Sequence, residues 1–283
     1  MLDRTTLDPA DAPEADGQER DETAALLAGM DDMSTRRPVA AQIIAVTSSD
    51  TTDARELAQV LIGDARLAGR VMKLANSAHF GMSGRVTSLQ LAIAVVGFTT
   101  VRTLATVTLT DSTDETELPA DFWDVGTGVA LAASALAPRF GEYAPDALCL
   151  GLLSQVGAAL LHHHDPAGYR ALVEETPDFT RRRGEEKRRY GMSSVQLSAA
   201  ALERWGFHES MAFPMHRLDD RTSPRGALLR AAFEVVARLT VPDRERVPIA
   251  PISCGKLGEE DLSRVLYDVR ESMADLRGMF RED

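Results

Sequence analysis

Apolar residues recur at helical spacing in almost every segment of this chain. In residues 53–75 they fall three or four positions apart, with a break at Gly63 after which Asp64 is placed to cap a second helix. Residues 86–96 repeat the spacing and stop at Gly97. The same pattern predicts further helices over residues 121–137, 146–161, 166–175, 193–205, 208–217, 224–239 and 259–280.

One segment is ambiguous. Residues 99–109 are rich in Thr and Val, which favour strands, but predicted helices flank them and we interpret them as helix. Residues 111–117 form a polar, acidic linker, and residues 241–258, with three prolines, form a predicted loop. No alternating block of convincing length and no fixed-period repeat is present. The sequence therefore predicts an all-α fold, a compact bundle of about a dozen helices.

Charge divides the chain into two parts. The net charge is -12, and residues 1–22 contribute half of it through eight acidic and two basic residues. Those residues lack apolar periodicity, so we predict a disordered acidic tail over residues 1–23 and a helical domain over residues 24–283. The tail is interpreted as a solubilising leader, with a regulatory arm as the alternative. The 44% hydrophobic and 26% charged residues are ordinary for a globular protein.

The rest of the composition excludes several function classes. A generally basic surface is absent, which makes nucleic acid an unlikely partner. The segment 181–189 holds six bases and two acids and is interpreted as a solvated loop or helix face, with an anionic ligand or nucleic acid as the alternative. Cys149 and Cys254 have no CxxC spacing, so the sequence predicts neither a disulfide framework nor a zinc ribbon. The most apolar windows, 89–98 and 147–161, are shorter than the roughly 20 residues of a membrane span, and no signal peptide is apparent, so we predict a cytoplasmic protein.

The motif search finds no phosphate-binding glycine loop and no nucleophile elbow. The histidines 162–164, followed by Asp165, are a candidate metal cluster. However, adjacent helical residues point about 100 degrees apart, so consecutive histidines diverge. Pro166 indicates a helix end, where histidine suits the macrodipole. The sequence favours this structural interpretation over a metal site.

Residues 74–81, LANSAHFG, predict a helix end followed by a turn. Asn76 and Ser77 are placed to satisfy backbone groups at the helix terminus. Phe80 is expected to pack into the core beside the turn, and Gly81 to adopt a backbone angle that other residues resist. The alternative is that this turn is an exposed docking site for a partner.

These residues are also where the chain resembles a known family. Residues 62–67 (IGDARL), 74–81 and 86–97 (VTSLQLAIAVVG) resemble, in order and at tight spacing, the N-terminal signature of the HDOD domain, and residues 102–104 match the motif that usually follows. Weaker agreement is found at Phe122 and Trp123, at residues 151–157 (GLLSQVG), at Tyr190 and Gly191, and at 196–205. The resemblance covers about residues 35–217. It implies an HD-like helical fold related to metal-dependent phosphohydrolases.

The departures from the family pattern bear on catalysis. At the position of the metal-binding His-Asp pair this chain has Ser154 and Gln155, and Ser194 stands where a histidine is common. His216 matches the first of a late histidine pair, whereas Arg217 replaces the second. The resemblance therefore implies a catalytically inactive member with no metal, no cofactor and no catalytic residue.

The functional hypothesis is a non-enzymatic bacterial signalling module that acts by binding unidentified signalling proteins. One alternative is a sensor that holds a nucleotide or other small molecule in the degenerate HD cavity, with Arg217 or the bases of 181–189 contacting phosphate. A further alternative is a residual metal-dependent phosphohydrolase that uses His216 and the histidines 162–164.

Overall fold

The computed structural model describes residues 26–27, 37–47, 52–82, 84–110 and 118–280. Every regular element in these ranges is a helix, which confirms the predicted all-α fold. The acidic tail over 1–23, the domain boundary at residue 24 and the linker 111–117 lie outside the described residues.

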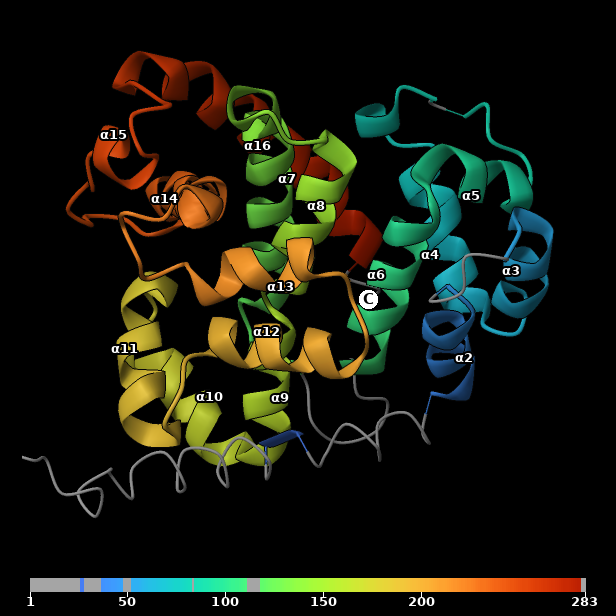
Figure 1. Ribbon diagram of the computed structural model, residues 1–283, viewed down its shortest axis with the longest axis horizontal. Helices are drawn as coiled ribbons and strands as arrows, with labels where there is room; N and C mark the ends of the chain where they lie inside the picture. Colours follow the sequence, from blue (N-terminus) through green and yellow to red (C-terminus); the bar gives the residue numbers. More distant parts are fainter. Residues whose placement is uncertain (1–25, 28–36, 48–51, 83, 111–117, 281–283) are drawn as a thin grey trace, which may run out of the picture.

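The N-terminal helices form one side of the molecule (Figure 1). They are α2 (Pro38–Val46), α3 (Ala54–Leu61), α4 (Ala65–Ala75), the 3-10 turn η1 (Ala78–Phe80), α5 (Leu89–Val96) and α6 (Phe98–Thr110). The Asp64 side chain accepts a hydrogen bond from Leu67 N (3.0 Å) and caps α4 as predicted, and Gly97 ends α5. Helix α6 packs against α2, α4 and α8, so it joins this group to the rest of the fold.

Helix α7, which has 19 residues, is the centre of the second group. It packs against α8, α14 and α16, while α12 packs against α9 and α13. The bounds of this group are α7 (Phe122–Phe140), α8 (Ala144–Leu153), α9 (Val156–His164), α10 (Pro166–Glu175), α11 (Phe179–Tyr190), α12 (Ser194–Arg204), α13 (Glu209–His216), η2 (Pro224–Gly226), α14 (Ala227–Thr240), α15 (Ile249–Ile252) and α16 (Glu259–Phe280). One hydrophobic cluster of mainly Ala, Leu and Val side chains runs through both groups.

The structure corrects several predicted boundaries. The single helix expected over 146–161 is two helices, α8 and α9, which meet at Ser154 and Gln155. Helix α2 was not predicted, because its nine residues are too uniformly apolar to show a period. The short helix α15 interrupts the loop predicted over 241–258.

The stretch Ala144–His164 is long and apolar enough to cross a membrane, and 83% of its most apolar window is buried inside the fold. The pair α5 and α6 passes the same test together, but the two helices are bent by 102°. Both stretches supply side chains to the hydrophobic cluster, although Leu91 of α5 is exposed.

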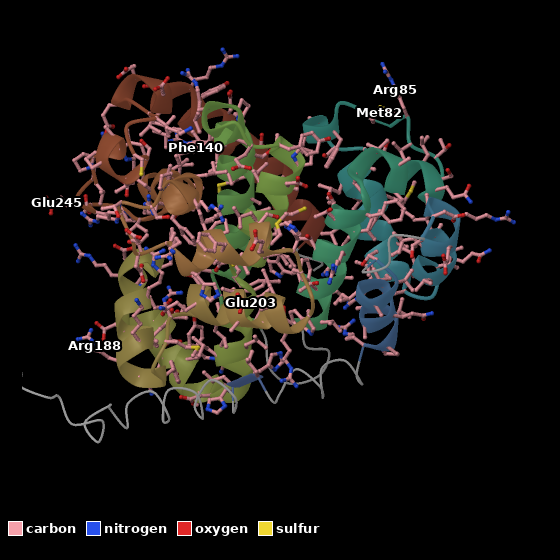
Figure 2. The ribbon with its side chains drawn as sticks, in the orientation of Figure 1. Met82, Arg85, Phe140, Arg188, Glu203 and Glu245 are labelled. Atoms are coloured by element: carbon pink, nitrogen blue, oxygen red, sulfur yellow. The ribbon has the colours of Figure 1, made fainter. Side chains whose placement is uncertain are left out.

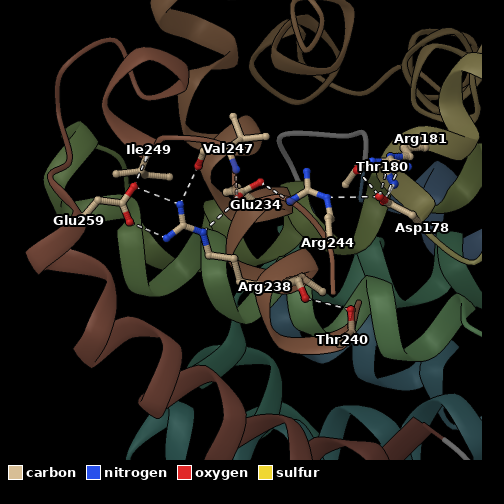
Figure 3. Close-up of polar contacts among 11 residues, drawn as sticks. Asp178, Thr180, Arg181, Glu234, Arg238, Thr240, Arg244, Val247, Ile249 and Glu259 are labelled. Atoms are coloured by element: carbon tan, nitrogen blue, oxygen red, sulfur yellow. Dashed lines mark hydrogen bonds and ion pairs between the residues drawn. The ribbon is translucent and has the colours of Figure 1, made fainter. Parts of the chain in front are cut away.

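A buried charged cluster fixes the C-terminal helices (Figure 3). Glu234 of α14 accepts hydrogen bonds from Arg238 Nε and from Arg244 Nη1, both at 2.8 Å. Arg244 also pairs with Asp178 at the start of α11 (3.3 Å), and Arg238 donates to Glu259 at the start of α16 (2.6 Å). These bonds tie α11, α14 and α16 together through the loop that contains Arg244.

Candidate functional site

The turn after α4 uses its polar side chains on the backbone. Asn76 Nδ2 donates to Met72 O (3.2 Å) and to Val86 O (2.9 Å), while Asn76 Oδ1 accepts from Val86 N (2.9 Å). Ser77 is buried, and its Oγ donates to Leu74 O (2.7 Å). Asn76 therefore caps α4 and also hydrogen-bonds to Val86 in the segment that leads into α5, as the sequence predicts for a structural turn.

The other two predicted residues of the turn are Gly81 and Phe80. Gly81 has a φ of 66°, the left-handed conformation that the sequence predicts there. Phe80 is half-buried: it packs against the hydrophobic cluster, as expected for a residue beside the core, but it lies at the edge of the cluster and not in its interior. Its ring meets the ring of His79 edge-on, with centroids 5.0 Å apart.

At the HD position, Ser154 and Gln155 form the junction between two helices. Ser154 is completely buried; its Oγ donates to Gly151 O (2.6 Å), and its carbonyl accepts from Ser198 Oγ (3.0 Å). Gln155 Nε2 lies 3.4 Å from Ser154 Oγ. Both side chains are thus engaged inside the protein, at the end of α8 and the start of α9.

Helix α12 lies against this junction because residue 157 is glycine. A Cβ atom at Gly157 would overlap the carbonyl group of Ser194, and Gly157 N donates to Ser198 Oγ (2.8 Å). The backbones of α9 and α12 are therefore in direct contact. This contact brings Ser194 next to the HD position, as the family resemblance implies.

A buried carboxylate connects Ser194 to the neighbouring helices. Glu186 of α11 is 1% exposed and accepts hydrogen bonds from Ser194 N (2.7 Å) and from Tyr169 Oη (2.8 Å). Burial, together with the negative charge of Glu186, raises the pKa of Tyr169 well above its ordinary value. Tyr169 thus remains a neutral hydrogen-bond donor to Glu186.

An ion pair between Arg182 and Asp121 lies next to this buried carboxylate. Arg182 of α11 donates through both terminal nitrogens to Asp121, at 3.2 and 2.8 Å, and through Nε to Thr176 O (2.9 Å). Burial opposes the charge of Arg182, but the hydrogen bonds and charge of Asp121 outweigh it, so the pKa of Arg182 is raised. Because Asp121 is the residue before α7, the pair holds α11 against the start of α7.

These residues leave almost no free space. The cavity that Gln155, Ser194, Arg182 and Glu186 line has a volume of about 10 Å³, room for at most about one water molecule. That volume counts against a nucleotide in the degenerate HD cavity.

The two late site positions lie elsewhere. His216 and Arg217 do not line this cavity. His216 Nε2 pairs with Glu203 on the exposed side of α12 (2.9 Å; Figure 2), and Arg217 stacks over Phe213. Of the five degenerate positions, the structure brings together Ser154, Gln155 and Ser194 and separates them from the other two.

The residues present do not fit the metal centre of an HD phosphohydrolase. Ser154 and Gln155 are neutral, and the nearby carboxylates of Glu186 and Asp121 are held by Tyr169 and Arg182. Within the described ranges no group of three His, Cys, Asp or Glu side chains is arranged to hold a metal ion. The histidines at 162–164 diverge as predicted: the first is buried, the second contacts Thr110 O (3.1 Å) and the third is exposed.

Helix α11 corrects the interpretation of residues 181–189 as a solvated face. Arg182 and Glu186 are buried, whereas Arg188 lies on the outer side and pairs with Glu185 (Figure 2). The sequence does contain a signal for this face, because Phe179, Arg182, Glu186 and Tyr190 follow one another at spacings of three and four. Two aromatic residues on that stripe indicate that its charges are buried too.

Comparison with known sequences supports the resemblance seen in the motifs. The sequence model of the HDOD domain matches residues 33–220. The chain belongs to the HDOD family. Those residues contain the signature turn, the HD position and α11. A search among curated proteins gave no match.

Solved structures share the fold of this HDOD protein at low sequence identity. A candidate phosphohydrolase from Shewanella amazonensis is 23% identical, with a TM-score of 0.60 over 90% of this chain and 95% of that one. An HDOD domain protein of unknown function from Geobacter sulfurreducens is 20% identical, with a TM-score of 0.60 over 89% and 96%. A candidate signal transduction protein from Marinobacter aquaeolei is 19% identical, with a TM-score of 0.69 over 96% of this chain and 68% of that one.

Proposed function

We propose that this HDOD protein is a non-enzymatic regulatory module of bacterial signalling that acts by binding other proteins. The observation that supports it most directly is the filled HD position. Ser154, Gln155 and Ser194 are engaged in helix contacts, and the remaining cavity of about 10 Å³ admits neither a metal with its water nor a phosphate ester. A metal-dependent phosphohydrolase must hold the metal with its water and the phosphate ester next to each other in one site.

The test is a hydrolysis assay on purified protein incubated with manganese, iron or magnesium. We expect no turnover of p-nitrophenyl phosphate, bis-p-nitrophenyl phosphate or ATP above that of the Glu186→Gln variant, and no stoichiometric metal after gel filtration. Metal-dependent turnover in the wild type that this variant lacks would contradict the proposal.

A groove that shares no lining residue with the cavity at the HD position offers a surface for a partner. It has a volume of about 430 Å³ and lies between the α7–α8 turn, α13 and η2. Its apolar lining includes Phe140, Leu150, Met211, Phe213 and Pro214. A cleft of this size with an aromatic lining suits the apolar face of a helix or extended peptide.

The charges around the groove indicate which partner fits. Glu142, Asp146 and Glu209 line it, and none of them forms an ion pair within the described part of the chain. Burial raises the pKa of Asp146 above its ordinary value. Arg225 and Lys256, the two cations of the groove, each stack on an aromatic ring instead. The partner segment is therefore apolar on one side and basic at its edge.

The probe for this groove is a synthetic amphipathic peptide of leucine and lysine, with a leucine and glutamate peptide as its counterpart. We expect only the basic peptide to bind, and binding to fall at least about tenfold when Glu142, Asp146 and Glu209 are all changed to lysine. The matched control changes the exposed pair Glu174 and Glu175 to lysine. Equal loss in this control would show non-specific attraction to an acidic protein and contradict the groove as the docking surface.

A further inference from the structure

A second cavity lies directly behind the closed HD position. Its volume is about 300 Å³, and it shares Arg183 and Phe233 with the small cavity at Gln155 and Ser194. It lies between α11 and α14, and the segments on either side of α14 border it. Four arginines and two carboxylates line it: Arg183, Arg221, Arg230, Arg244, Asp219 and Glu234. The lining is thus net positive, although the chain as a whole has a net charge of -12.

Most of these charges already have partners. Arg244 is held by Glu234 and Asp178, as described above (Figure 3). Asp219 pairs with Lys187 of α11, and Lys187 is not itself part of the cavity lining.

Arg230 is also committed. Its guanidinium donates to the backbone carbonyls of Arg217 (3.0 Å), Asp220 (2.6 Å), Ser223 (2.7 Å) and Ile252 (2.9 Å). It therefore shapes the wall of the cavity and keeps little capacity for a ligand. The two lining arginines whose side chains donate no hydrogen bond inside the described protein are Arg183 and Arg221.

Arg183 is held in an unusual way. Its Nη1 is buried and has no hydrogen-bond acceptor among the described residues, while its guanidinium lies over the Phe233 ring at 4.9 Å. Burial lowers its pKa, against the more distant negative charges of Asp219, Glu186 and Asp178. A buried donor without an acceptor costs about 1–3 kcal/mol and calls for an explanation in a native structure.

Nη1 of Arg183 is closed off from water, but Nε and Nη2 are not buried and donate no hydrogen bond within the described residues, so these are the donors that an anion in the cavity can reach. A guanidinium stacked on an aromatic ring is fixed in position and weakly hydrated, which suits two-point hydrogen bonding to phosphate oxygens. Arg221 is exposed at the cavity, where it can approach the same anion from the solvent side. The cavity volume is at the lower end of the range for small-molecule sites.

We propose that this cavity binds a small phosphate-bearing anion, which Arg183 and Arg221 contact through their guanidinium groups. The site adjoins the degenerate HD cavity, with which it shares Arg183 and Phe233, and it has no lining residue in common with the groove between α7 and α13. It adds ligand sensing to the proposed regulatory function, without depending on it.

The experiment is isothermal titration calorimetry of the full chain with inorganic pyrophosphate, inorganic phosphate and ATP, at constant ionic strength set with sodium chloride. We expect saturable binding of at least one of these anions to the wild type. Arg183→Gln and Arg221→Gln are each expected to weaken it at least about tenfold. Arg188→Gln, which removes an exposed charge from the same helix, is expected to bind as the wild type does.

The outcomes separate the sources of the anion. Tighter binding of ATP than of pyrophosphate identifies a phosphate ester, and the reverse order identifies a free inorganic anion. Absence of binding by all three probes, or unchanged binding in Arg221→Gln, would overturn the proposal. Because Arg221 is exposed, that variant keeps the test decisive even if Arg183→Gln does not fold. Circular dichroism of each variant confirms that it is folded before titration.

Discussion

The signature turn and the HD position both contain buried polar side chains, but those side chains act over very different distances along the chain. Asn76 bonds the backbone of Val86, ten residues away. Arg182 pairs with Asp121, 61 residues away, and Ser198 donates to Ser154 over 44 residues. The polar side chains of the turn bond nearby backbone groups, whereas those at the HD position join helices that are far apart in the sequence. Loss of a polar group should therefore affect the second region more than the first.

The largest effect is expected at Glu186. Glu186→Ala leaves Tyr169 Oη and Ser194 N without their acceptor in a region with almost no water, which should lower the free energy of unfolding by about 2–5 kcal/mol. Urea denaturation followed by circular dichroism measures the change. Glu185→Ala on the same helix is the control and should stay within about 0.5 kcal/mol of wild type. Similar stabilities for the two variants would show that the HD position is not held together by this carboxylate.

Asn76 should give the next effect. Asn76→Ala removes its bonds to Met72 and Val86 at a partly exposed turn, and we expect a loss of about 1–2 kcal/mol in the same denaturation experiment. Lys73→Ala, one turn earlier on the exposed side of α4, is the control. Wild-type stability of the Asn76 variant, combined with loss of a binding partner, would favour the docking interpretation of the turn.

Phe80 distinguishes packing from hydrogen bonding within the turn. Full burial would make Phe80→Ala cost about 3–5 kcal/mol, but the side chain is half-buried, so we expect about 1–2 kcal/mol. Thermal unfolding by calorimetry measures it. A cost in the fully buried range would mean that Phe80 packs more deeply than the structure shows.

The smallest effect concerns the partly exposed end of the charged cluster. Hydrogen bonds from Arg238 and from the backbone of Ile249 lower the pKa of Glu259 from 4.5 to about 2. A lowered pKa in the folded state means that the contribution is complete above pH 4.5 and is lost as the pH falls from about 4.5 to about 2. The side chain is 58% exposed, so the contribution is below about 1 kcal/mol.

Glu259→Gln tests this directly. Denaturation midpoints measured between pH 2 and pH 6 should fall less steeply with acidification in the variant than in the wild type, with the difference confined to the window below pH 4.5. Parallel curves would show that Glu259 titrates alike in the folded and unfolded states.

The sequence predicted the helices and the turn because the forces that shape them act between near neighbours. Asp64, Gly97, Asn76 and Gly81 each fulfil a local backbone requirement that is visible in a short window. The HD position was located through its resemblance to the family motif.

The network around the HD position could not be predicted in the same way. The pairing of Arg182 with Asp121 depends on how α11 packs against the start of α7. The sequence around either residue does not indicate which residue is its partner. The apolar stripe on α11 indicates that Arg182 is buried, but not with which residue it pairs. The break of α8 at Ser154 was missed for a related reason, since the apolar run continues through it.

The contact between α9 and α12 leaves no room for metal ligands at the HD position. Ser154 is completely buried, Gly157 admits no side chain, and the adjoining space is occupied by Glu186 and Arg182. Ser154→His together with Gln155→Asp would therefore insert larger or charged groups into a filled interior, with an overpacking cost of about 1–3 kcal/mol before any metal could bind. The close packing of α9 against α12 would therefore oppose any substitution that introduced metal ligands at this position.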